Sequence, residues 1–337
     1  MKKLGVCVVG LGFVGGQAHA PSMNKIKNAN LVAVCDMNDK LATKYSTKYG
    51  CKKYLSTKEA LKDPEIEAAV IAVPTPFHCS VAMEFIKAGK HVLLEMPLGI
   101  NVGQTKKIIA AAKSAKVTLM PSLNFRFAPI YKRVKEMIKK EKVLGKGPVA
   151  VHYREYISAN LLAAQWPPKS WAWDKQKSGG PLFTLSVWSI DLMRWLFEAD
   201  LKQLHAVAEN HKLKKYDGTH GYMGYAIAEF TNGTITSMEY SGGVCNDQTV
   251  VSMELVGENT NLITAIDTHT IKINTDDVHE TVHKVQVGGP KVWGHYQMDE
   301  HFVSSILKGK APEITPRDGL IATEAGVKIA KMYRQLK

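Results

Sequence analysis

The sequence predicts an α/β domain with a doubly wound parallel sheet, followed by an α+β domain built on a large, mostly antiparallel, open-faced sheet. The first part of the chain alternates short apolar runs with helical stretches, and the second part carries many strand-like runs with few helices. The length of 337 residues suits two domains. We expect these to span residues 1–122 and 123–337, with the last helix able to pack back on the first domain.

Five short runs in the first domain are rich in Val, Leu and Ile and do not alternate strictly between apolar and polar residues. This pattern is typical of parallel strands that are covered on both faces. Helical stretches separate the runs, so the ligand of such a sheet should lie at its carboxyl edge. The predicted strands are 4–9, 31–35, 69–73, 91–95 and 117–121, and the predicted helices lie near 16–28, 39–49, 57–62, 78–89 and 101–115.

The pattern changes after about residue 122. Asn232-Gly233 stands between two strand-like runs and predicts a hairpin with a two-residue turn. The predicted strands are 149–157, 203–211, 224–231, 234–240, 250–256, 261–265, 270–274 and 281–286, and the predicted helices lie near 127–140, 182–197, 295–308 and 317–336.

A glycine motif follows the first predicted strand. Gly10, Gly12 and Gly15 have the spacing G-x-G-x-x-G, a helical pattern follows, and Asp36 ends the next apolar run. In a dinucleotide site the glycines give a tight turn and let the backbone approach the pyrophosphate, the helix N-terminus faces the phosphates, and the carboxylate holds the ribose hydroxyls. The sequence therefore predicts a Rossmann nucleotide site; the alternative is a glycine-rich turn that only packs.

Composition narrows the class of protein. Apolar and charged contents of 45% and 22% are ordinary for a globular protein, and no apolar run reaches the length of a membrane span. The net charge of +13 comes from lysines spread over helix faces, which favours anionic small ligands over nucleic acid. The five cysteines are scattered and glycines interrupt the apolar start, so we expect a cytoplasmic protein and not a secreted one.

Several further segments resemble one known family. They are Val73-Pro74-Thr75-Pro76-Phe77-His78, Ala88 to Pro97, Ser178-Gly179-Gly180 leading into Ile190-Asp191-Leu192, Asn124-Phe125-Arg126-Phe127, and Pro312 to Asp318 followed by a helix. Together with the glycine loop they resemble the glucose-fructose oxidoreductase / inositol dehydrogenase (Gfo/Idh/MocA) family over essentially the whole chain. The resemblance implies NAD(P)-linked hydride transfer on sugars, cyclitols or related alcohols, and a homodimer or homotetramer formed through the second sheet.

The resemblance also implies the cofactor site and a cis peptide between Met96 and Pro97. Asp36 is followed by Met37-Asn38 and lacks the Arg that would accept a 2′-phosphate, so NAD is favoured, while Lys40 leaves NADP open. The cofactor-binding residues are predicted to be Gly10, Gly12, Phe13, Val14, Gly15, Asp36, Pro74, Thr75, His78, Glu95, Met96 and Asn124.

Two departures from the family pattern concern the proton chemistry. Met96 replaces the Lys of Glu-Lys-Pro, and Trp188 replaces the His that usually acts as general acid or base. Neither replacement can take up a proton, because a thioether is only a weak acceptor and an indole N–H only donates. The predicted catalytic residues are Asp191, His78 and Tyr153, with Tyr156, Lys169, Lys175 and His295 as further candidates.

The predicted substrate-binding residues have structural alternatives. Arg126 could hold an anionic ligand or form an ion pair between the domains, and Asp191 could form a salt bridge. His78 and Glu95 could make structural hydrogen bonds instead of organising the cofactor site. Trp188 could be a stacking wall or a core residue, and Trp166, Trp171 and Trp173 could form an aromatic wall or a packed loop. The predicted substrate-binding set is Arg126, Trp171, Trp188 and Asp191.

No metal is expected, because His279 and His283 have i, i+4 spacing in a strand-like segment without a third ligand. The sequence thus supports two functions. One is an NAD(P)-dependent oxidoreductase acting on a sugar, polyol or related carbonyl, with a non-standard acid or base. The other is a non-catalytic NAD(P)-binding or sensor protein. We expect a small sugar-like or anionic substrate, no nucleic-acid partner and no membrane partner.

Overall fold

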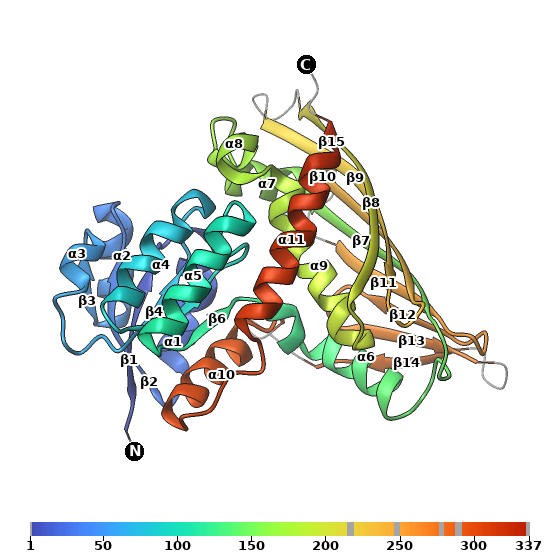
Figure 1. Ribbon diagram of the computed structural model, residues 1–337, viewed down its shortest axis with the longest axis horizontal. Helices are drawn as coiled ribbons and strands as arrows, with labels where there is room; N and C mark the ends of the chain where they lie inside the picture. Colours follow the sequence, from blue (N-terminus) through green and yellow to red (C-terminus); the bar gives the residue numbers. More distant parts are fainter. Residues whose placement is uncertain (1, 214–218, 246–249, 276–279, 287–291, 335–337) are drawn as a thin grey trace. The chain divides into compact units, whose positions relative to one another are not determined.

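The computed structural model describes residues 2–213, 219–245, 250–275, 280–286 and 292–334. The chain divides into two compact units (Figure 1). The first unit comprises Met1–Asn124 and Gly294–Glu324, and the second comprises Phe125–Trp293 and Ala325–Lys337. The first division lies close to residue 122, but the segment after residue 293 returns to the first unit before the chain ends in the second.

The sheet of the first unit has the strand order β3-β2-β1-β4-β5-β6, and all its described strands are parallel. This is a doubly wound order, in which ligands bind outside the carboxyl ends of the strands where the order reverses, between β1 and β4. The predicted fold class of this part is confirmed. Its strands are β1 (Leu4–Val9), β2 (Ala29–Cys35), β3 (Lys52–Tyr54), β4 (Ala68–Ile71), β5 (His91–Leu94) and β6 (Leu119–Pro121).

Helices connect these strands, and polar side chains mark where several of them begin. Asn38 and Asn101 accept backbone N–H groups at the starts of two helices, and Gly50 ends the first of these in the left-handed region. The helical elements of the first unit are η1 (Gly15–His19), α1 (Ala20–Lys25), α2 (Asp39–Tyr49), α3 (Thr57–Ala60), η2 (Thr75–Phe77), α4 (His78–Lys87), α5 (Val102–Ala115), α10 (His295–Leu307) and the first part of α11 (Pro316–Met332).

The second unit is built on a larger sheet with the described strand order β14-β13-β12-β11-β7-β10-β9-β8-β15. Neighbouring strands are antiparallel except for β7 with β10 and β8 with β15, so the prediction of a mostly antiparallel sheet is confirmed. The strands are β7 (Ala150–Ser158), β8 (Leu201–Leu213), β9 (Thr219–Phe230), β10 (Ile235–Val244), β11 (Val250–Val256), β12 (Leu262–Ile266), β13 (Thr270–Asn274), β14 (Thr281–Lys284) and β15 (Tyr333–Arg334).

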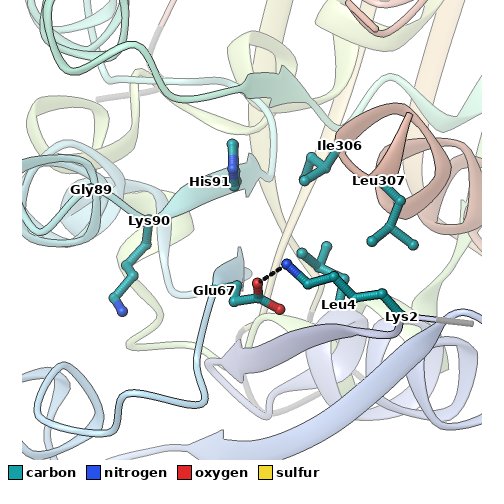
Figure 2. Close-up of a pocket in the computed structure, with 8 residues that line it drawn as sticks. All are labelled: Lys2, Leu4, Glu67, Gly89, Lys90, His91, Ile306 and Leu307. Atoms are coloured by element: carbon teal, nitrogen blue, oxygen red, sulfur yellow. Dashed lines mark ion pairs between the residues drawn. The ribbon is translucent and has the colours of Figure 1, made fainter. Parts of the chain in front are cut away.

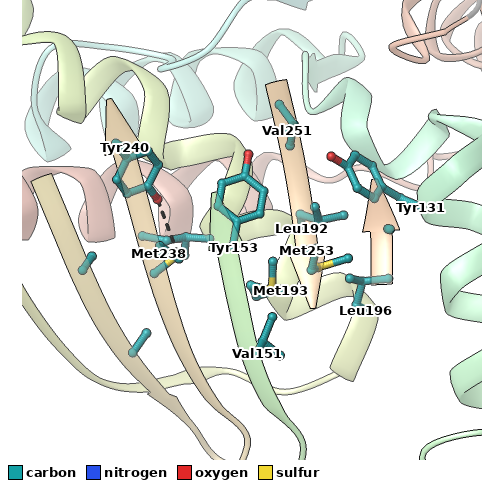
Figure 3. Packing of buried hydrophobic residues seen from close by; sticks show 14 of the residues in the cluster. Tyr131, Val151, Tyr153, Leu192, Met193, Leu196, Met238, Tyr240, Val251 and Met253 are labelled. Carbon is teal, nitrogen blue, oxygen red and sulfur yellow. Dashed lines mark hydrogen bonds between the residues drawn. The ribbon is translucent and has the colours of Figure 1, made fainter. Parts of the chain in front are cut away.

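The helices of the second unit gather on one face of this sheet (Figure 1). Most of α9 is buried, and its Leu192 and Met193 pack in one layer with Tyr153 and Met253 of the sheet (Figure 3). This layer is the core of the unit. The helical elements are η3 (Asn124–Phe127), which begins at the division between the units, α6 (Pro129–Lys139), α7 (Ala159–Gln165), η4 (Trp171–Trp173), α8 (Lys175–Ser178), α9 (Pro181–Phe197) and the second part of α11.

The hairpin at Asn232-Gly233 forms, but its turn is longer than predicted. Phe230 N–H donates to the carbonyl oxygen of Thr234 at 2.9 Å, which leaves three residues in the turn. Gly233 adopts a φ of 85°, the conformation that a glycine commonly supplies in a three-residue turn. Over the described residues, no helix combines the length and apolar character needed to cross a membrane.

The burial of α9 gives a stability prediction. All six tryptophans lie in the second unit, so their fluorescence reports on its unfolding. Leu192 is fully buried, and we expect Leu192→Ala to lower the free energy of unfolding in urea by about 2–5 kcal/mol through lost contacts and a cavity. Met37→Ala is the control, because Met37 is 91% exposed and lies in the first unit. Equal effects of the two changes would contradict the prediction.

Candidate functional site

The glycine loop leads from β1 into a helical segment that begins at Phe13. Gly10 has a φ of 87°, and a Cβ there would lie 2.6 Å from the carbonyl oxygen of Ala72. A Cβ at Gly15 would overlap the carbonyl oxygen of Gly10. The protein's own backbone therefore leaves room only for glycine at these two positions. The glycine loop lies directly against the chain segment that follows β4.

Gly12 is different from the other two glycines. A Cβ on Gly12 would meet no protein atom within 4 Å, so packing does not explain the residue. The space in front of its backbone is the space that a pyrophosphate needs when it approaches a glycine loop closely. The loop therefore fits a dinucleotide phosphate, and the alternative of a turn that only packs does not account for Gly12.

Asp36 lies directly after β2 and is tied to this loop. Its Oδ2 accepts a hydrogen bond from the backbone N–H of Leu11 at 2.7 Å, and its Oδ1 accepts one from Asn38 at 2.8 Å. Each carboxylate oxygen has a second lone pair, so both can still accept from ribose hydroxyls. Phe13 is 43% exposed at the tip of the same loop and Val14 is half-buried.

The segment after β4 carries the predicted residues Pro74, Thr75 and His78. Thr75 and His78 are each 2% exposed. The His78 ring nitrogens lie 2.7 Å from the carbonyl oxygen of Pro97 and 2.8 Å from that of Val73. Burial lowers the pKa of His78, and the two carbonyl oxygens and the charge of Glu95 oppose this effect. His78 thus links the chain after β4 to the chain after β5, which is the structural alternative considered above.

Glu95 follows β5 directly and belongs to a buried cluster in the first unit. Its Oε1 lies 2.8 Å from Nε2 of His19, and the hydroxyl of Ser122 donates to the same oxygen. The Nδ1 atom of His19 lies 2.9 Å from Oδ1 and 3.1 Å from Oδ2 of Asp299. We call Asp299, His19 and Glu95 the buried triad. It joins η1, the end of β5 and α10.

In the buried triad, the positive charge of His19 and the negative charges of Asp299 and Glu95 attract one another. Burial alone would lower the pKa of His19, but the charges and hydrogen bonds of Asp299 and Glu95 outweigh it and raise the pKa to about 10. Burial opposes ionisation of Glu95, yet hydrogen bonding and attraction by His19 lower its pKa. Burial raises the pKa of Asp299, against the attraction of His19. His295 meets His19 edge to face, and burial and the charge of His19 lower its pKa to about 4.

Two other predicted cofactor residues, Met96 and Asn124, are buried in this region, with exposed fractions of 2% and 4%. The peptide bond between Met96 and Pro97 is cis, as the family resemblance implied. Sequence reasoning missed His19 and Asp299. His19 stands four residues after Gly15, within the helix of the glycine motif, and that position was an available signal; Asp299 had none, because it lies 280 residues further along the chain.

A hollow of about 400 Å³ lies elsewhere in the first unit (Figure 2). Leu4, Glu67 and His91 line it at the amino ends of β1, β4 and β5, and Lys2 forms an ion pair with Glu67 at 2.9 Å. The hollow therefore lies at the edge opposite the glycine loop. The position of the loop, and not this hollow, marks the nucleotide site, because ligands of such sheets bind at the carboxyl edge.

In the second unit, Arg126 and Asp191 form a buried ion pair. Nε of Arg126 lies 2.7 Å from Oδ2 and Nη2 lies 2.6 Å from Oδ1, so the guanidinium meets both carboxylate oxygens. Nη1 of Arg194 lies 3.7 Å from the same carboxylate. The prediction that Arg126 could pair between domains is therefore replaced by a pair inside one unit. The bidentate geometry engages Asp191, which was a predicted catalytic and substrate-binding residue.

Tyr153 is fully buried, and its hydroxyl donates to Oε2 of Glu155 at 2.8 Å. The two side chains lie on the same face of β7, since they are two residues apart. Burial raises the pKa of Glu155 to about 7, and the hydrogen bond from Tyr153 opposes the rise. Burial and the nearby Glu155 raise the pKa of Tyr153 well above its ordinary value. Sequence reasoning named Tyr153 and missed Glu155, although the alternation of β7, which places Glu155 on the same buried face as Tyr153, was an available signal.

The aromatic residues fall into two groups. Trp166 and Trp173 are buried and pack edge to face, and Trp173 Nε1 donates to the carbonyl oxygen of Trp166 at 3.1 Å. Trp171 is half-buried and lines a hollow of about 610 Å³ with Pro167 and Lys169. Trp188 is half-buried on α9. The packed-loop alternative thus describes Trp166 and Trp173, whereas Trp171 lines an open space.

The described residues contain no group of three His, Cys, Asp or Glu side chains that could hold a metal ion. His283 lies on β14, and His279 lies outside the described residues. Of the remaining candidates for the proton, Tyr156 is half-buried on β7 and Lys175 begins α8.

Two family models match the chain. The model described as "Oxidoreductase family, NAD-binding Rossmann fold" matches residues 4–123, and the one described as "Oxidoreductase family, C-terminal alpha/beta domain" matches residues 135–335. The chain therefore belongs to the Gfo/Idh/MocA oxidoreductase family, and its first unit contains the NAD-binding Rossmann fold.

Curated relatives match over part of their length. The myo-inositol 2-dehydrogenase of Thermotoga maritima is 26% identical over 200 residues, 59% of this chain and 56% of the relative. The glucose-6-phosphate 3-dehydrogenase of Bacillus subtilis is 26% identical over 200 residues, which cover 59% of this chain and 55% of the relative. An uncharacterized oxidoreductase of Synechocystis is 30% identical over 207 residues, which cover 58% of this chain and 51% of the relative. The chain spans about half the length of the curated relatives it matches.

Solved structures share the fold over nearly the whole chain. GenD2 from gentamicin A biosynthesis, solved in complex with NAD, has a TM-score of 0.82 at 25% identity. The match covers 98% of this chain and 94% of the GenD2 chain. The biliverdin reductase of Synechocystis, solved with biliverdin and NADP+, has a TM-score of 0.81 at 20% identity, with 98% and 99% covered. The second likeness concerns the fold alone.

The buried triad gives a pH-dependent stability prediction. His19 has a raised pKa in the folded protein, so its contribution is complete below its ordinary pKa of about 6.5 and is lost as the pH rises through about 10. We expect His19→Gln to lower the free energy of unfolding by about 3–5 kcal/mol near pH 7, because two buried carboxylates lose their counter-charge. The difference from wild type should shrink toward pH 10.

The measurement is the free energy of unfolding from urea titrations followed by far-ultraviolet circular dichroism between about pH 7 and 10. His205→Gln is the control, because His205 is exposed on β8. A cost of His19→Gln that stays constant over this pH range would show that His19 is not held as a cation.

Proposed function

We propose that the protein is an NAD(P)-dependent oxidoreductase that transfers a hydride between the nicotinamide and a sugar, polyol or related carbonyl compound. The observation that carries the proposal is the open backbone at Gly12, tied through Leu11 to Asp36, in a chain of this family. Relatives named for inositol and glucose 6-phosphate support a sugar-like substrate, and the net charge of +13 suits an anionic one. The cofactor, when bound, supplies the site that accepts or donates the hydride.

The residues of the first unit support NAD more than NADP. The glycine loop would hold the phosphates with backbone N–H groups, and Asp36 would hold the ribose hydroxyls. A 2′-phosphate would meet the negative charge of Asp36, and Met37 and Asn38 bring no positive charge to compensate it. NADP binding would depend on lysines such as Lys40, the second residue of α2.

Oxidation of an alcohol also releases a proton, which a side chain must accept. Asp191 is engaged by Arg126, and both ring nitrogens of His78 face backbone carbonyls. The pair of Tyr153 and Glu155 contains a carboxyl group whose pKa of about 7 suits proton exchange at neutral pH. We therefore assign the non-standard acid or base to this pair, with Glu155 holding the proton and Tyr153 passing it on.

A second function is also supported by residues of this chain. Met96 and Trp188 stand at the two positions where the family resemblance places the proton chemistry, and Tyr153 is fully buried. These features favour a non-catalytic protein that binds NAD(P) and senses it. The two functions share the nucleotide site and differ in whether any alcohol or carbonyl compound is turned over.

We further propose that the protein forms a homodimer or homotetramer through its second sheet and acts in the cytoplasm. Apolar side chains stand exposed on β8 and β9, and the strand register places Val207 opposite Tyr225. Met223, Tyr225 and Ile227 alternate along β9 and share one face. An exposed apolar patch of this kind on a sheet suits contact with a second copy of the chain.

The nucleotide site is tested by changing Gly12. We expect Gly12→Ala to weaken NAD binding by about tenfold or more, because the added methyl group takes the space of the pyrophosphate, while the free energy of unfolding stays within about 0.5 kcal/mol of wild type. Titration calorimetry with NAD and NADP measures binding. Gly89→Ala is the matched control: a Cβ there also meets no protein atom, although its φ of 72° costs some stability. Absence of binding by the wild type to either nucleotide would end the proposal.

The proton pair is tested with a panel of sugars, polyols and their carbonyl forms. We expect Glu155→Gln to lower kcat by about a hundredfold or more and to remove the rise of kcat with pH near pH 7. Glu254→Gln on β11 is the control, because Glu254 is 46% exposed. Asp191→Asn is less informative, because it leaves a buried guanidinium without its partner and destabilises the fold.

Turnover that survives Glu155→Gln with its pH dependence intact would refute the assignment of the proton to this pair. Absence of turnover by the wild type over the whole panel, together with NAD binding, would favour the sensor function.

The oligomer is tested by light scattering coupled to size-exclusion chromatography. We expect the mass of a dimer or tetramer for the wild type and a smaller species for Ile227→Lys, because a charge placed in the apolar patch must lose its hydration on association. Val282→Lys on β14 is the control, since Val282 is 46% exposed at the far edge of the same sheet. A monomeric wild type would contradict this part of the proposal.

A further inference from the structure

The buried triad carries one net negative charge wherever its shared proton resides. If both ring nitrogens of His19 carry hydrogen, one imidazolium faces two carboxylates at 2.8 and 2.9 Å. If the proton on Nδ1 moves to Asp299, a neutral imidazole faces one carboxylic acid and the carboxylate of Glu95. The two arrangements hold the same number of protons, so the sum of the charges is the same in both.

The negative charge is concentrated on Glu95. Three donors are directed at its carboxylate: Nε2 of His19, the hydroxyl of Ser122, and the backbone N–H of Met96, which lies 3.2 Å from Oε2. Donors aimed at a carboxylate stabilise its ionised form. Glu95 is 7% exposed, so water screens its charge only weakly.

Among the neighbours of the buried triad, His295 brings no charge near pH 7, because burial and the charge of His19 lower its pKa to about 4. Burial also lowers the pKa of His78, against the effect of its two carbonyl partners. The side chain of Met96 is buried and apolar. Across the described ranges, neither Lys nor Arg forms an ion pair with Glu95 or Asp299; the ion pairs of both carboxylates are made with His19.

The strand order places this charge on one side of the nucleotide site. Asp36 follows β2, the glycine loop follows β1, and Glu95 follows β5, in the order β2-β1-β4-β5 along the carboxyl edge. A dinucleotide with its phosphates at the glycine loop and its adenosine ribose at Asp36 extends its other half past β4. The nicotinamide half of a bound dinucleotide would therefore lie on the side of the sheet that carries Glu95.

We propose that the buried triad makes this site bind the oxidised nicotinamide, whose ring is a cation, in preference to the reduced nicotinamide, whose ring is neutral. The inference rests on the proposed function as an NAD(P) site and deepens it. Glu95 supplies the charge, and His19 and Asp299 act as positioning residues that hold it. A separation of about 10 Å between the two charges, at an effective dielectric constant of about 20, would give a preference of about tenfold.

The experiment measures Kd for NAD+ and NADH, and for NADP+ and NADPH, by titration calorimetry on the folded full chain. We expect Glu95→Gln to lower the ratio of the NADH Kd to the NAD+ Kd by about tenfold, because glutamine keeps the shape and loses the charge. Asp299→Asn should lower the ratio in the same direction. Glu67→Gln is the matched control, because it removes a carboxylate at the opposite edge of the same sheet and should leave the ratio unchanged.

A purely structural role of the buried triad would weaken the oxidised and reduced forms equally, and an unchanged ratio in Glu95→Gln would overturn the inference while NAD(P) binding stands. If Glu95→Gln does not fold, the ratio measured for Asp299→Asn decides in the same way. If the wild type binds none of the four nucleotides, the proposed function fails first and the inference falls with it.

Discussion

The first unit depends on one buried imidazole that meets carboxylates on both sides. His19 lies in the helical segment after the glycine loop, Glu95 follows β5, and Asp299 comes from α10, which the chain reaches after Phe125–Trp293 of the second unit. The ion pair between Asp299 and His19 is one of the contacts that join the returning segment Gly294–Glu324 to η1. Removing one member would leave a buried charge without its counter-charge, which costs far more than losing an exposed ion pair.

The two units differ in how far they follow the family pattern. The glycine loop, Asp36 and Glu95 keep the features of a dinucleotide site, and the loop geometry accounts for each glycine. In the second unit, the ionisable groups are paired with one another: Arg126 with Asp191, and Tyr153 with Glu155. The hydrogen bonds of the glycine loop and those of the two pairs in the second unit form separate sets.

The sequence predicted the fold and the glycine loop well, because both are expressed locally. Apolar runs mark the strands, and Gly10 and Gly15 are required by backbone geometry that a motif records. Short elements such as β3 escaped, since its Lys-Lys-Tyr sequence is mostly exposed and carries no apolar signal. The buried triad could not be derived in full, because it joins segments that lie 76 and 280 residues apart in the sequence. The Tyr153–Glu155 pair is local, and the alternation of β7 already places both side chains on one face.

The helical segment after the glycine loop is a π-helix over Gly15–His19 before it continues as α-helix. A π turn contains one residue more than an α turn, so it changes the direction in which all later side chains of the helix point. In a regular α-helix, successive side chains are rotated by about 100° around the helix axis. If the extra residue of the π turn were lost, the His19 side chain would therefore point away from Glu95 and Asp299. The wide turn is therefore a spacer between the glycine loop and His19, and it directs the His19 side chain at Glu95 and Asp299.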